Sequence, residues 1–349
     1  MSTLGELVRD PVFQLNSVLW LVQPLPGGAG MTPVLREAGF EVHAVAPPLA
    51  PPPDVLLRLK DSGLAHQDRV LPDVVLRQAR NRRFALIECK GRSFGRDSTN
   101  ASQARTLIVI AGPRLHESLG LQPSDVAEGA AAFLVPEADA SRMRATLAEL
   151  RDELTQANLQ CGGALAVGID PQTDALILIA DEPARRFFDL ASGREPFMQV
   201  EPDTDPRPLY FVPYDPDCRQ SDDERAFCKR VLFERLHATV LGAAGRAVPP
   251  ATLTFQVESL LNEATLGMYD LWENPESNRH MRRLVRELMA RIGKVTNTEC
   301  PDSLQQVQGT GWELRLADDA SQAKVLAVLA RFSCETMDLR QDPEPGLFD

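Results

Sequence analysis

The sequence predicts an α/β fold followed by a mainly helical C-terminal part. Between residues 25 and 182, short apolar runs that read as strands alternate with segments of helical periodicity, which is typical of a sheet flanked by helices. Residues 183–220 are rich in proline and aspartate, and from residue 221 the pattern becomes helical. We therefore expect an α/β domain over 1–182, a linker or irregular excursion over 183–220, and a mainly helical domain over 221–349.

Composition limits the classes of protein that the chain can belong to. It has 349 residues, 44% of them hydrophobic and 25% charged, which is ordinary for a globular protein with a sizeable core. No apolar run approaches a membrane span, and the N-terminus lacks a basic start followed by an apolar stretch, so we expect a soluble cytoplasmic protein without a membrane partner. Six cysteines without a C-x-x-C pair argue against a zinc knuckle or a disulfide scaffold.

The first part of the α/β domain is expected to hold one helix and three strands. Residues 31–46 predict a helix that stops at Gly39 and is followed by a strand. The proline-rich stretch 46–57 predicts a stiff connector. Two apolar runs, VLPDVVL and FALIEC, then predict an antiparallel strand pair around an arginine-rich turn.

The rest of this domain continues the alternation. Residues 97–112 begin with capping residues and predict a helix over the sheet, although their TLIVIAG end fits a strand equally well. Residues 130–138 predict a buried strand, and 141–159 have the clearest helical periodicity. ALAVGID and ALILIAD predict a strand pair around a PQT turn.

The C-terminal part contains three expected helices, of which the third is basic. They are DDERAFCKRVLFERLHATVLG, FQVESLLNEATLGMYDLW and SNRHMRRLVRELMARIGKV. The third helix and the strand-like GWELRL after it fit the recognition helix and wing of a winged-helix DNA-binding module, with Arg282 and Arg283 as candidate DNA contacts. The alternative is an amphipathic helix that buries its apolar side and leaves its arginines in water. DASQAKVLAVLARF predicts a last helix.

Positive charge gathers around the two central strands although the chain is acidic. The net charge of −12 argues against a protein that coats nucleic acid non-specifically. From residue 77 to 105, however, eight basic residues stand against two acids. Screening confines charge effects to about 10 Å, so such a face can hold a phosphate backbone, but a solvated turn and helix face is equally compatible. The candidate phosphate contacts are Arg77, Arg80, Arg82, Arg83, Arg92 and Arg96.

Acidic residues and a lysine stand on the two apolar strands. Glu88 and Lys90 are two residues apart, so they project from the same face of their strand. If Asp73 lies opposite on the neighbouring strand, two carboxylates and an ammonium converge. Such charges are costly to bury unless they are paired or bind a metal. Two acids and the backbone carbonyl of Cys89 suffice for Mg²⁺ or Mn²⁺, because Mg²⁺ retains several waters.

These residues resemble the signature of the PD-(D/E)XK nuclease superfamily, which has the restriction-endonuclease-like fold. Pro72-Asp73 is followed by fourteen residues and then Glu88-Cys89-Lys90. The resemblance implies a helix, three strands, a helix and a further strand over about residues 31–138. It implies that Asp73 and Glu88 hold the metal and that Lys90 serves the attacking water.

The resemblance also suggests two further site residues. Glu37 is the candidate for an additional metal-binding acid on the first helix. Gln103 is the candidate for a glutamine on the helix after the lysine. The tyrosine that follows this glutamine in the exonuclease branch is replaced by Leu107, which leaves the subfamily open.

The expected function is that of a Mg²⁺- or Mn²⁺-dependent nuclease. The favoured substrate is DNA, and the expected setting is restriction, anti-phage defence or repair. A protein partner for targeting and a homodimer for cleavage of two strands are compatible with this function. The alternatives are a non-catalytic nucleic-acid-binding or assembly subunit that keeps the nuclease fold, and a transcription regulator that uses the C-terminal helices. The sequence does not decide between endonuclease and exonuclease.

Overall fold

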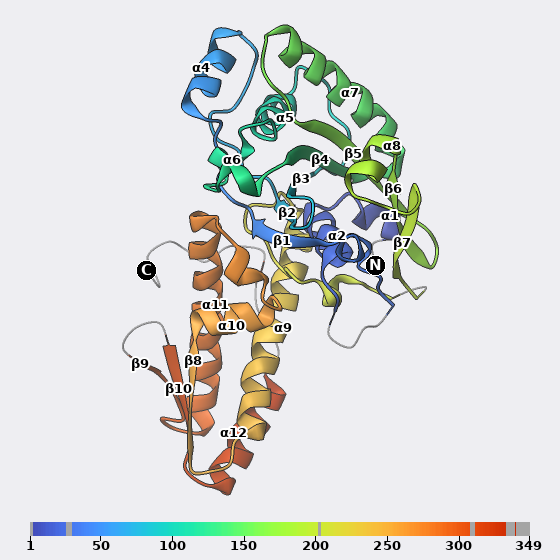
Figure 1. The fold of residues 1–349 in the computed structure, drawn as a ribbon. Coiled ribbons are helices and arrows are strands. Elements are labelled where there is room, and N and C mark those ends of the chain that lie inside the picture. Colours follow the sequence, from blue (N-terminus) through green and yellow to red (C-terminus); the bar gives the residue numbers. More distant parts are fainter. Residues whose placement is uncertain (1–2, 26–29, 202–203, 308–310, 333–338, 340–349) are drawn as a thin grey trace. The chain divides into compact units, whose positions relative to one another are not determined.

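The computed structural model describes residues 3–25, 30–201, 204–307, 311–332 and 339, and it divides the chain into two compact units (Figure 1). Unit 1 comprises residues 1–209 together with the short segment 271–274. Unit 2 comprises residues 210–270 and 275–349.

Unit 1 is built on a mixed sheet of seven strands, which confirms the predicted α/β class. The strands follow one another in the sheet in chain order, from β1 at one edge to β7 at the other. β3, β4 and β5 are parallel, and every other neighbouring pair is antiparallel. The strands are β1 (Phe40–Val45), β2 (Val74–Gln78), β3 (Arg83–Cys89), β4 (Glu128–Pro136), β5 (Gly163–Pro171), β6 (Ala175–Ala180) and β7 (Arg194–Gln199).

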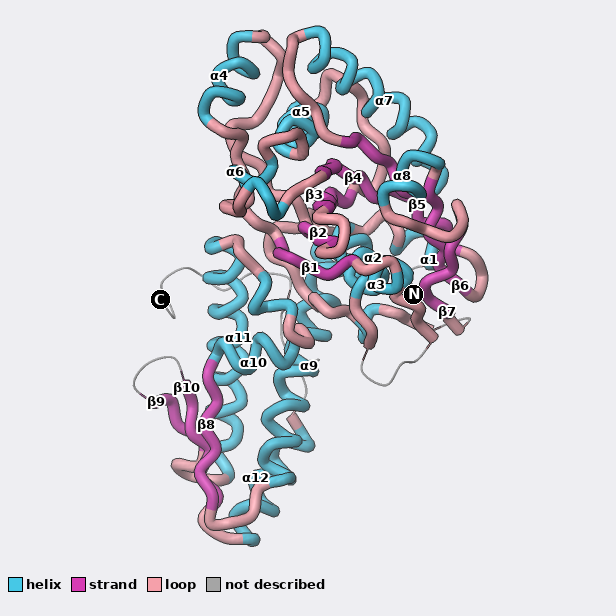
Figure 2. The backbone as a smooth tube through the Cα atoms, viewed as in Figure 1, coloured by secondary structure: helices cyan, strands magenta, loops and turns pink. Residues whose placement is uncertain are grey.

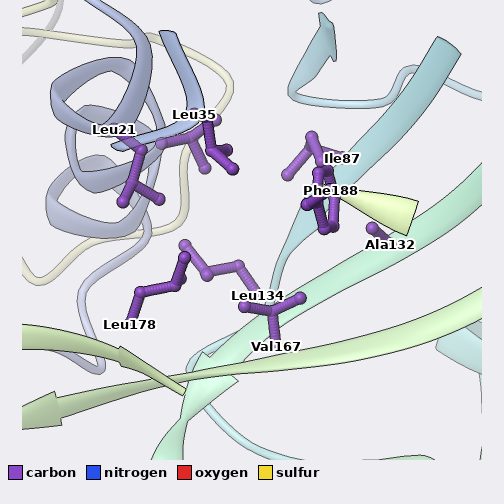
Figure 3. Close-up of a pocket in the computed structure, with 9 residues that line it drawn as sticks. Leu21, Leu35, Ile87, Ala132, Leu134, Val167, Leu178 and Phe188 are labelled. Atoms are coloured by element: carbon purple, nitrogen blue, oxygen red, sulfur yellow. The ribbon is translucent and has the colours of Figure 1, made fainter. Parts of the chain in front are cut away.

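Helices cover both faces of this sheet. On one face, α5 and α7 pack against Val75, Phe84, Leu86 and Phe133 in a continuous apolar core. On the other face, α2 and α3 lie over Ile87 and enclose a small apolar cavity (Figure 3). The helices of unit 1 are α1 (Leu4–Leu7), α2 (Pro11–Val22), α3 (Val34–Glu37), α4 (Pro53–Asp61), α5 (Thr99–Ile110), α6 (Leu115–Ser118), α7 (Glu137–Gln156) and α8 (Glu182–Phe187), with 3-10 turns at Pro123–Asp125 and Arg207–Leu209.

Most of the predicted strands and helices of unit 1 are present. The helix that stops at Gly39 is a single turn, α3, and Gly39 takes a positive φ of 87°, which favours glycine. The segment 97–112 is helical to its end, so the strand alternative is wrong. Ser98 caps α5 by accepting the N–H of Ala101 at 3.2 Å, and the apolar TLIVIAG end is buried against the sheet.

Two regions of unit 1 differ from the prediction. The stretch 46–57 contains the start of α4, because proline is compatible with the first turn of a helix. The predicted linker 183–220 contains β7, which completes the sheet as an edge strand. Pro196 weakens the strand signal of this segment, but proline is tolerated at a sheet edge.

Unit 2 consists of helices and one antiparallel sheet of three strands in the order β8–β10–β9 (Figure 2). The predicted helix over residues 255–272 is wrong at its start and in its second half, because α10 ends at Ala264 and a 3-10 turn follows at Met268–Leu271. Phe255 belongs to β8, where it pairs with Trp312 of β10, and helix α10 begins only at Val257. The elements are α9 (Asp222–Arg246), β8 (Ala251–Gln256), α10 (Val257–Ala264), α11 (Pro275–Glu299), β9 (Leu304–Val307), β10 (Gly311–Leu316) and α12 (Asp319–Arg331), with a 3-10 turn at Met268–Leu271.

The segment 271–274 adds to the β1 edge of the seven-stranded sheet. Trp272 forms a parallel bridge with Val45, and the N–H of Glu273 donates to the carbonyl of Val45 at 2.9 Å. Trp272 is buried. Among the helices of the described residues, none has both the length and the apolar content required to cross a lipid bilayer.

Candidate active site

The register of the β2–β3 hairpin places Asp73 beside the end of β3. Val74 pairs with Ile87, so the next position along each strand brings Asp73 alongside Glu88. The Oδ2 atom of Asp73 accepts the backbone N–H of Cys89 at 2.6 Å. The Asp73 carbonyl also accepts the N–H of Ala46 at 3.0 Å, which ties this residue to the end of β1. The carboxylate of Asp73 is therefore directed toward β3.

Glu88 is a buried carboxylate with one uncommitted oxygen. It lies on the α5 side of the sheet, like Leu86 and Phe84, which are two and four residues earlier in the same strand. It is only 4% exposed. Its Oε1 accepts from Lys90, whereas its Oε2 is buried and has no hydrogen-bond partner among the described residues. Burial and the nearby Asp73 carboxylate raise the pKa of Glu88 to about 8, although Lys90 acts in the opposite direction.

Lys90 is held between the two sides of the site. Its Nζ donates to Oε1 of Glu88 at 2.6 Å and to Oε1 of Gln103 on α5 at 3.2 Å. Its backbone N–H donates to the carbonyl of Leu134 on β4 at 2.8 Å. Burial opposes protonation, but the carboxylates of Glu88 and Asp73 raise the pKa of Lys90 above its usual value. The structure therefore brings together four of the predicted site residues, and the lysine is a protonated donor.

The site offers oxygen atoms of the kind that a hard divalent cation prefers. The uncommitted Oε2 of Glu88 has a cost in free energy that coordination would remove. Asp73 supplies the second carboxylate, and the backbone carbonyl of Cys89 is the third predicted ligand. No cluster of three or more His, Cys, Asp or Glu side chains suited to a metal occurs within the described residues. Two carboxylates are compatible with Mg²⁺, which keeps several of its waters in proteins.

Glu37 does not join this group. It is exposed at the end of α3, and none of the interactions of the described residues links it to Asp73 or Glu88. The reason lies in the layers of unit 1. Leu35 of α3 lies over Ile87, which points away from the face that carries Glu88 (Figure 3). The proposed additional metal ligand is therefore on the wrong side of the sheet.

The arginines of the hairpin turn lie at the other end of β2 and β3. Five residues of strand separate that turn from Asp73, which corresponds to about 17 Å. Arg83 is engaged with Glu128 and Asp189, each at 2.9 Å. The Nη1 atom of Arg82 donates to the carbonyl of Ser124 at 2.9 Å, while Arg80 is exposed and Arg77 lies 4.0 Å from Glu41. A phosphate bound at Asp73 and Glu88 is out of reach of this turn, so any phosphate that these arginines contact belongs to a more distant part of the nucleic acid.

Arg92 and Arg96 lie at the correct end of the hairpin. Both belong to the loop that leads from Lys90 to α5, and both are exposed. Within the described residues, the side chain of Arg96 has only long contacts, to Asp97 at 3.7 Å and to Glu153 at 3.8 Å. These two arginines remain candidates for phosphate binding.

In unit 2 the two predicted DNA contacts are only half-exposed on α11. Arg282 donates to the hydroxyl of Tyr269 at 2.9 Å and lies 3.4 Å from Glu258. The Nε atom of Arg283 is buried without a hydrogen-bond partner among the described residues. Arg282 is therefore engaged with its own unit, whereas Arg283 is partly buried.

Sequence reasoning missed Gln14, a buried residue of α2 whose side chain contacts the backbone of Lys90. Its Nε2 donates to the Lys90 carbonyl at 2.9 Å. The signal was present in the sequence, because Gln14 interrupts the almost wholly apolar run PVFQLNSVLWLV. A polar side chain in such a run requires a buried hydrogen-bond partner.

Comparison with known proteins adds no assignment: no family model, curated protein or solved structure matches this chain.

Proposed function

We propose that this chain is a metal-dependent nuclease that hydrolyses phosphodiester bonds, with DNA as the favoured substrate. The observation that supports this function is the group of Asp73, Glu88 and Lys90 at one end of the β2–β3 hairpin, in which Glu88 is buried and the other two are partly exposed. Burial of a carboxylate beside a second carboxylate is unfavourable for folding, as the raised pKa of Glu88 indicates. A reaction that requires these charges explains why the chain keeps them.

Each residue has a distinct role in the proposed reaction. Asp73, Glu88 and the Cys89 carbonyl would hold Mg²⁺ or Mn²⁺, which when bound supplies neutralisation of the charge that builds up on the phosphate. Lys90 donates a hydrogen bond that orients the attacking water and offsets negative charge in the transition state. Gln103 keeps the ammonium in place through its Oε1.

Nucleic acid would approach this site along the loop that follows Lys90. The exposed Arg92 and Arg96 of this loop would bind the phosphates on either side of the scissile bond. The turn at residues 80–82 has no role, because it lies at the far end of the hairpin.

Unit 2 would position the DNA. Its order of helices and strands, with β10 between β8 and β9, resembles a winged-helix module in which α11 is the recognition helix. Because Arg282 is engaged and Arg283 is partly buried, the exposed Arg279 and Lys294 of α11 are the better phosphate contacts. Restriction, anti-phage defence and repair are all settings for such an enzyme, with a protein partner or a second copy of the chain assisting target selection.

The direct test is nicking of supercoiled plasmid, with linear and single-stranded DNA in parallel, in Mg²⁺ or Mn²⁺. We expect Lys90→Ala to lower the rate by about 100-fold or more, because it removes the positioned donor. Glu88→Gln should have a similar effect. Lys60→Ala is the matched control, since Lys60 lies on α4 and is exposed. Circular dichroism checks that each variant folds. Equal cleavage by the wild type and Lys90→Ala would end the assignment.

One observation favours a second candidate, a non-catalytic binding or assembly subunit that keeps the nuclease fold. Lys90 pairs directly with Glu88 at 2.6 Å, so these charges also partly neutralise each other without a metal. Calorimetric titration with Mn²⁺ separates the two functions. If the chain is a nuclease, Mn²⁺ should bind with a heat that the Asp73→Asn variant lacks. If it is a binding subunit, the titrations of the wild type and of Asp73→Asn should be the same.

A further inference from the structure

The backbone of Lys90 is held by the N-terminal segment of unit 1. The Nε2 atom of Gln14 donates to the carbonyl of Lys90 and to the carbonyl of Val8, each at 2.9 Å. The Gln14 side chain is completely buried, and no residue that the structure describes forms a hydrogen bond with its Oε1. Gln14 therefore connects the turn before α2 to the peptide group of Lys90.

The residues after Lys90 fit tightly against the same segment. A Cβ atom on Gly91 would lie 2.4 Å from the carbonyl oxygen of Arg9, which is too close for any other residue type. The Nη1 atom of Arg9 donates to the carbonyl of Gly91 at 3.4 Å. On the other side, Ser93 donates its N–H and its hydroxyl to Oδ1 of Asp139, at 3.0 Å and 2.8 Å. The backbone from residue 90 to 93 is thus fixed from two directions.

Gln14 is one of three polar residues among the buried residues of α2, together with Asn16 and Ser17. The residues around position 14 in this helix, such as Phe13, Leu15 and Val18, are buried and apolar. Burial of an amide costs free energy unless its hydrogen bonds are made, and the Oε1 of Gln14 has none among the described residues. The two bonds of its Nε2, to the carbonyls of Val8 and Lys90, offset this cost, and the second of them reaches the candidate site.

We propose that Gln14 is a positioning residue for Lys90, an inference that rests on the proposed nuclease function. A lysine side chain has four rotatable bonds, so its ammonium is placed only if both ends are fixed. Gln103 and Glu88 hold the ammonium end. Gln14 holds the backbone end, through the carbonyl of Lys90.

The first test compares Gln14→Leu with Ser17→Ala. Ser17 is an equally buried polar residue of α2, but its hydroxyl donates only within the helix, to the carbonyl of Phe13 at 2.9 Å. We expect Gln14→Leu to lower kcat for nicking by roughly 10- to 100-fold, because misplacement of a catalytic group has effects of this size. KM should stay within about twofold, since Gln14 does not contact the substrate. Ser17→Ala should leave both constants unchanged.

A second readout does not depend on nuclease activity. Brief competition labelling with acetic anhydride, followed by mass spectrometry of the peptides, gives the reactivity of Lys90 relative to the exposed Lys60. Gln14→Leu should raise the relative labelling of Lys90 severalfold, and Ser17→Ala should not. Gln14→Asn, whose shorter side chain cannot span both carbonyls, gives the same comparison if Gln14→Leu fails to fold.

The two readouts separate the failure of each proposal. If the wild type does not nick DNA but Lys90 becomes more reactive in the Gln14 variants, the nuclease function is wrong and the positioning of Lys90 stands. If a folded Gln14 variant keeps the wild-type kcat and the wild-type labelling of Lys90, the role of Gln14 is overturned.

Discussion

Arg105 links α5, the helix that carries Gln103, to α7 through Glu153. Glu153→Gln should therefore lower the free energy of unfolding by about 3 kcal/mol. The Nε and Nη2 atoms of Arg105 donate to Oε2 of Glu153 on α7, at 3.0 Å and 2.8 Å. Arg105 also donates to the carbonyls of Arg96 at 3.0 Å and Ala65 at 3.3 Å. The guanidinium is almost completely buried.

The magnitude follows from the charge that the substitution would leave behind. Removal of one partner of a buried ion pair typically costs about 3 to 5 kcal/mol, because the remaining charge is uncompensated. The Glu153 side chain is 22% exposed, so water partly solvates the site and the lower end of this range applies. The glutamine amide preserves the shape and one oxygen acceptor, so the measured loss reports mainly the charge.

The assay is equilibrium unfolding in urea, followed by tryptophan fluorescence in a Trp312→Phe background. Trp20 and Trp272 then remain, and both lie in unit 1. Glu149→Gln is the matched control, because Glu149 is exposed on the same helix and should change the free energy of unfolding by less than about 0.5 kcal/mol. If Glu153→Gln lowers the free energy of unfolding by no more than Glu149→Gln does, the ion pair with Arg105 does not stabilise the fold as argued.

Two further predictions concern a buried acid and the glutamine of the site. Burial raises the pKa of Asp215 to about 6, so its contribution to stability is complete below about pH 4 and is lost as the pH rises through about 6. Asp215→Asn should therefore reduce the fall in stability between pH 4 and pH 7 by about 3 kcal/mol, measured by urea unfolding at both values. Gln103→Leu removes one acceptor from Lys90 and should lower kcat for nicking by roughly 10-fold, a change that steady-state kinetics would detect; an unaltered kcat would exclude a role for Gln103.

The central pair of strands could be predicted because its signals are local. Alternating apolar residues, a polar turn and the spacing of Asp73 from Glu88 and Lys90 suffice to define an antiparallel hairpin with its charges at one end. The same antiparallel pairing shows why Arg80 and Arg82 cannot reach the site, since the turn of a hairpin lies opposite its open end.

Other features depend on tertiary contacts that the sequence does not display. Helix α2 is buried on nearly all sides, so it lacks the one-sided periodicity by which helices are recognised. Arg83 was expected to bind phosphate, but its partners Glu128 and Asp189 are 45 and 106 residues away in the chain. Glu37 was assigned from its place on an early helix, and only the layers of the sheet reveal that it faces the opposite side.

The segment 271–274 has a practical consequence for dividing the protein. The chain passes between the two units three times, after residues 209, 270 and 274. A fragment that ends near residue 209 would lose the residues that protect β1, and an unprotected sheet edge invites pairing with other molecules and precipitation. A fragment that starts near residue 210 would retain Trp272 without the strand it covers. Poor solubility of either half would therefore reflect the unprotected edge of β1 or the exposed side chain of Trp272, and not only the stability of that half.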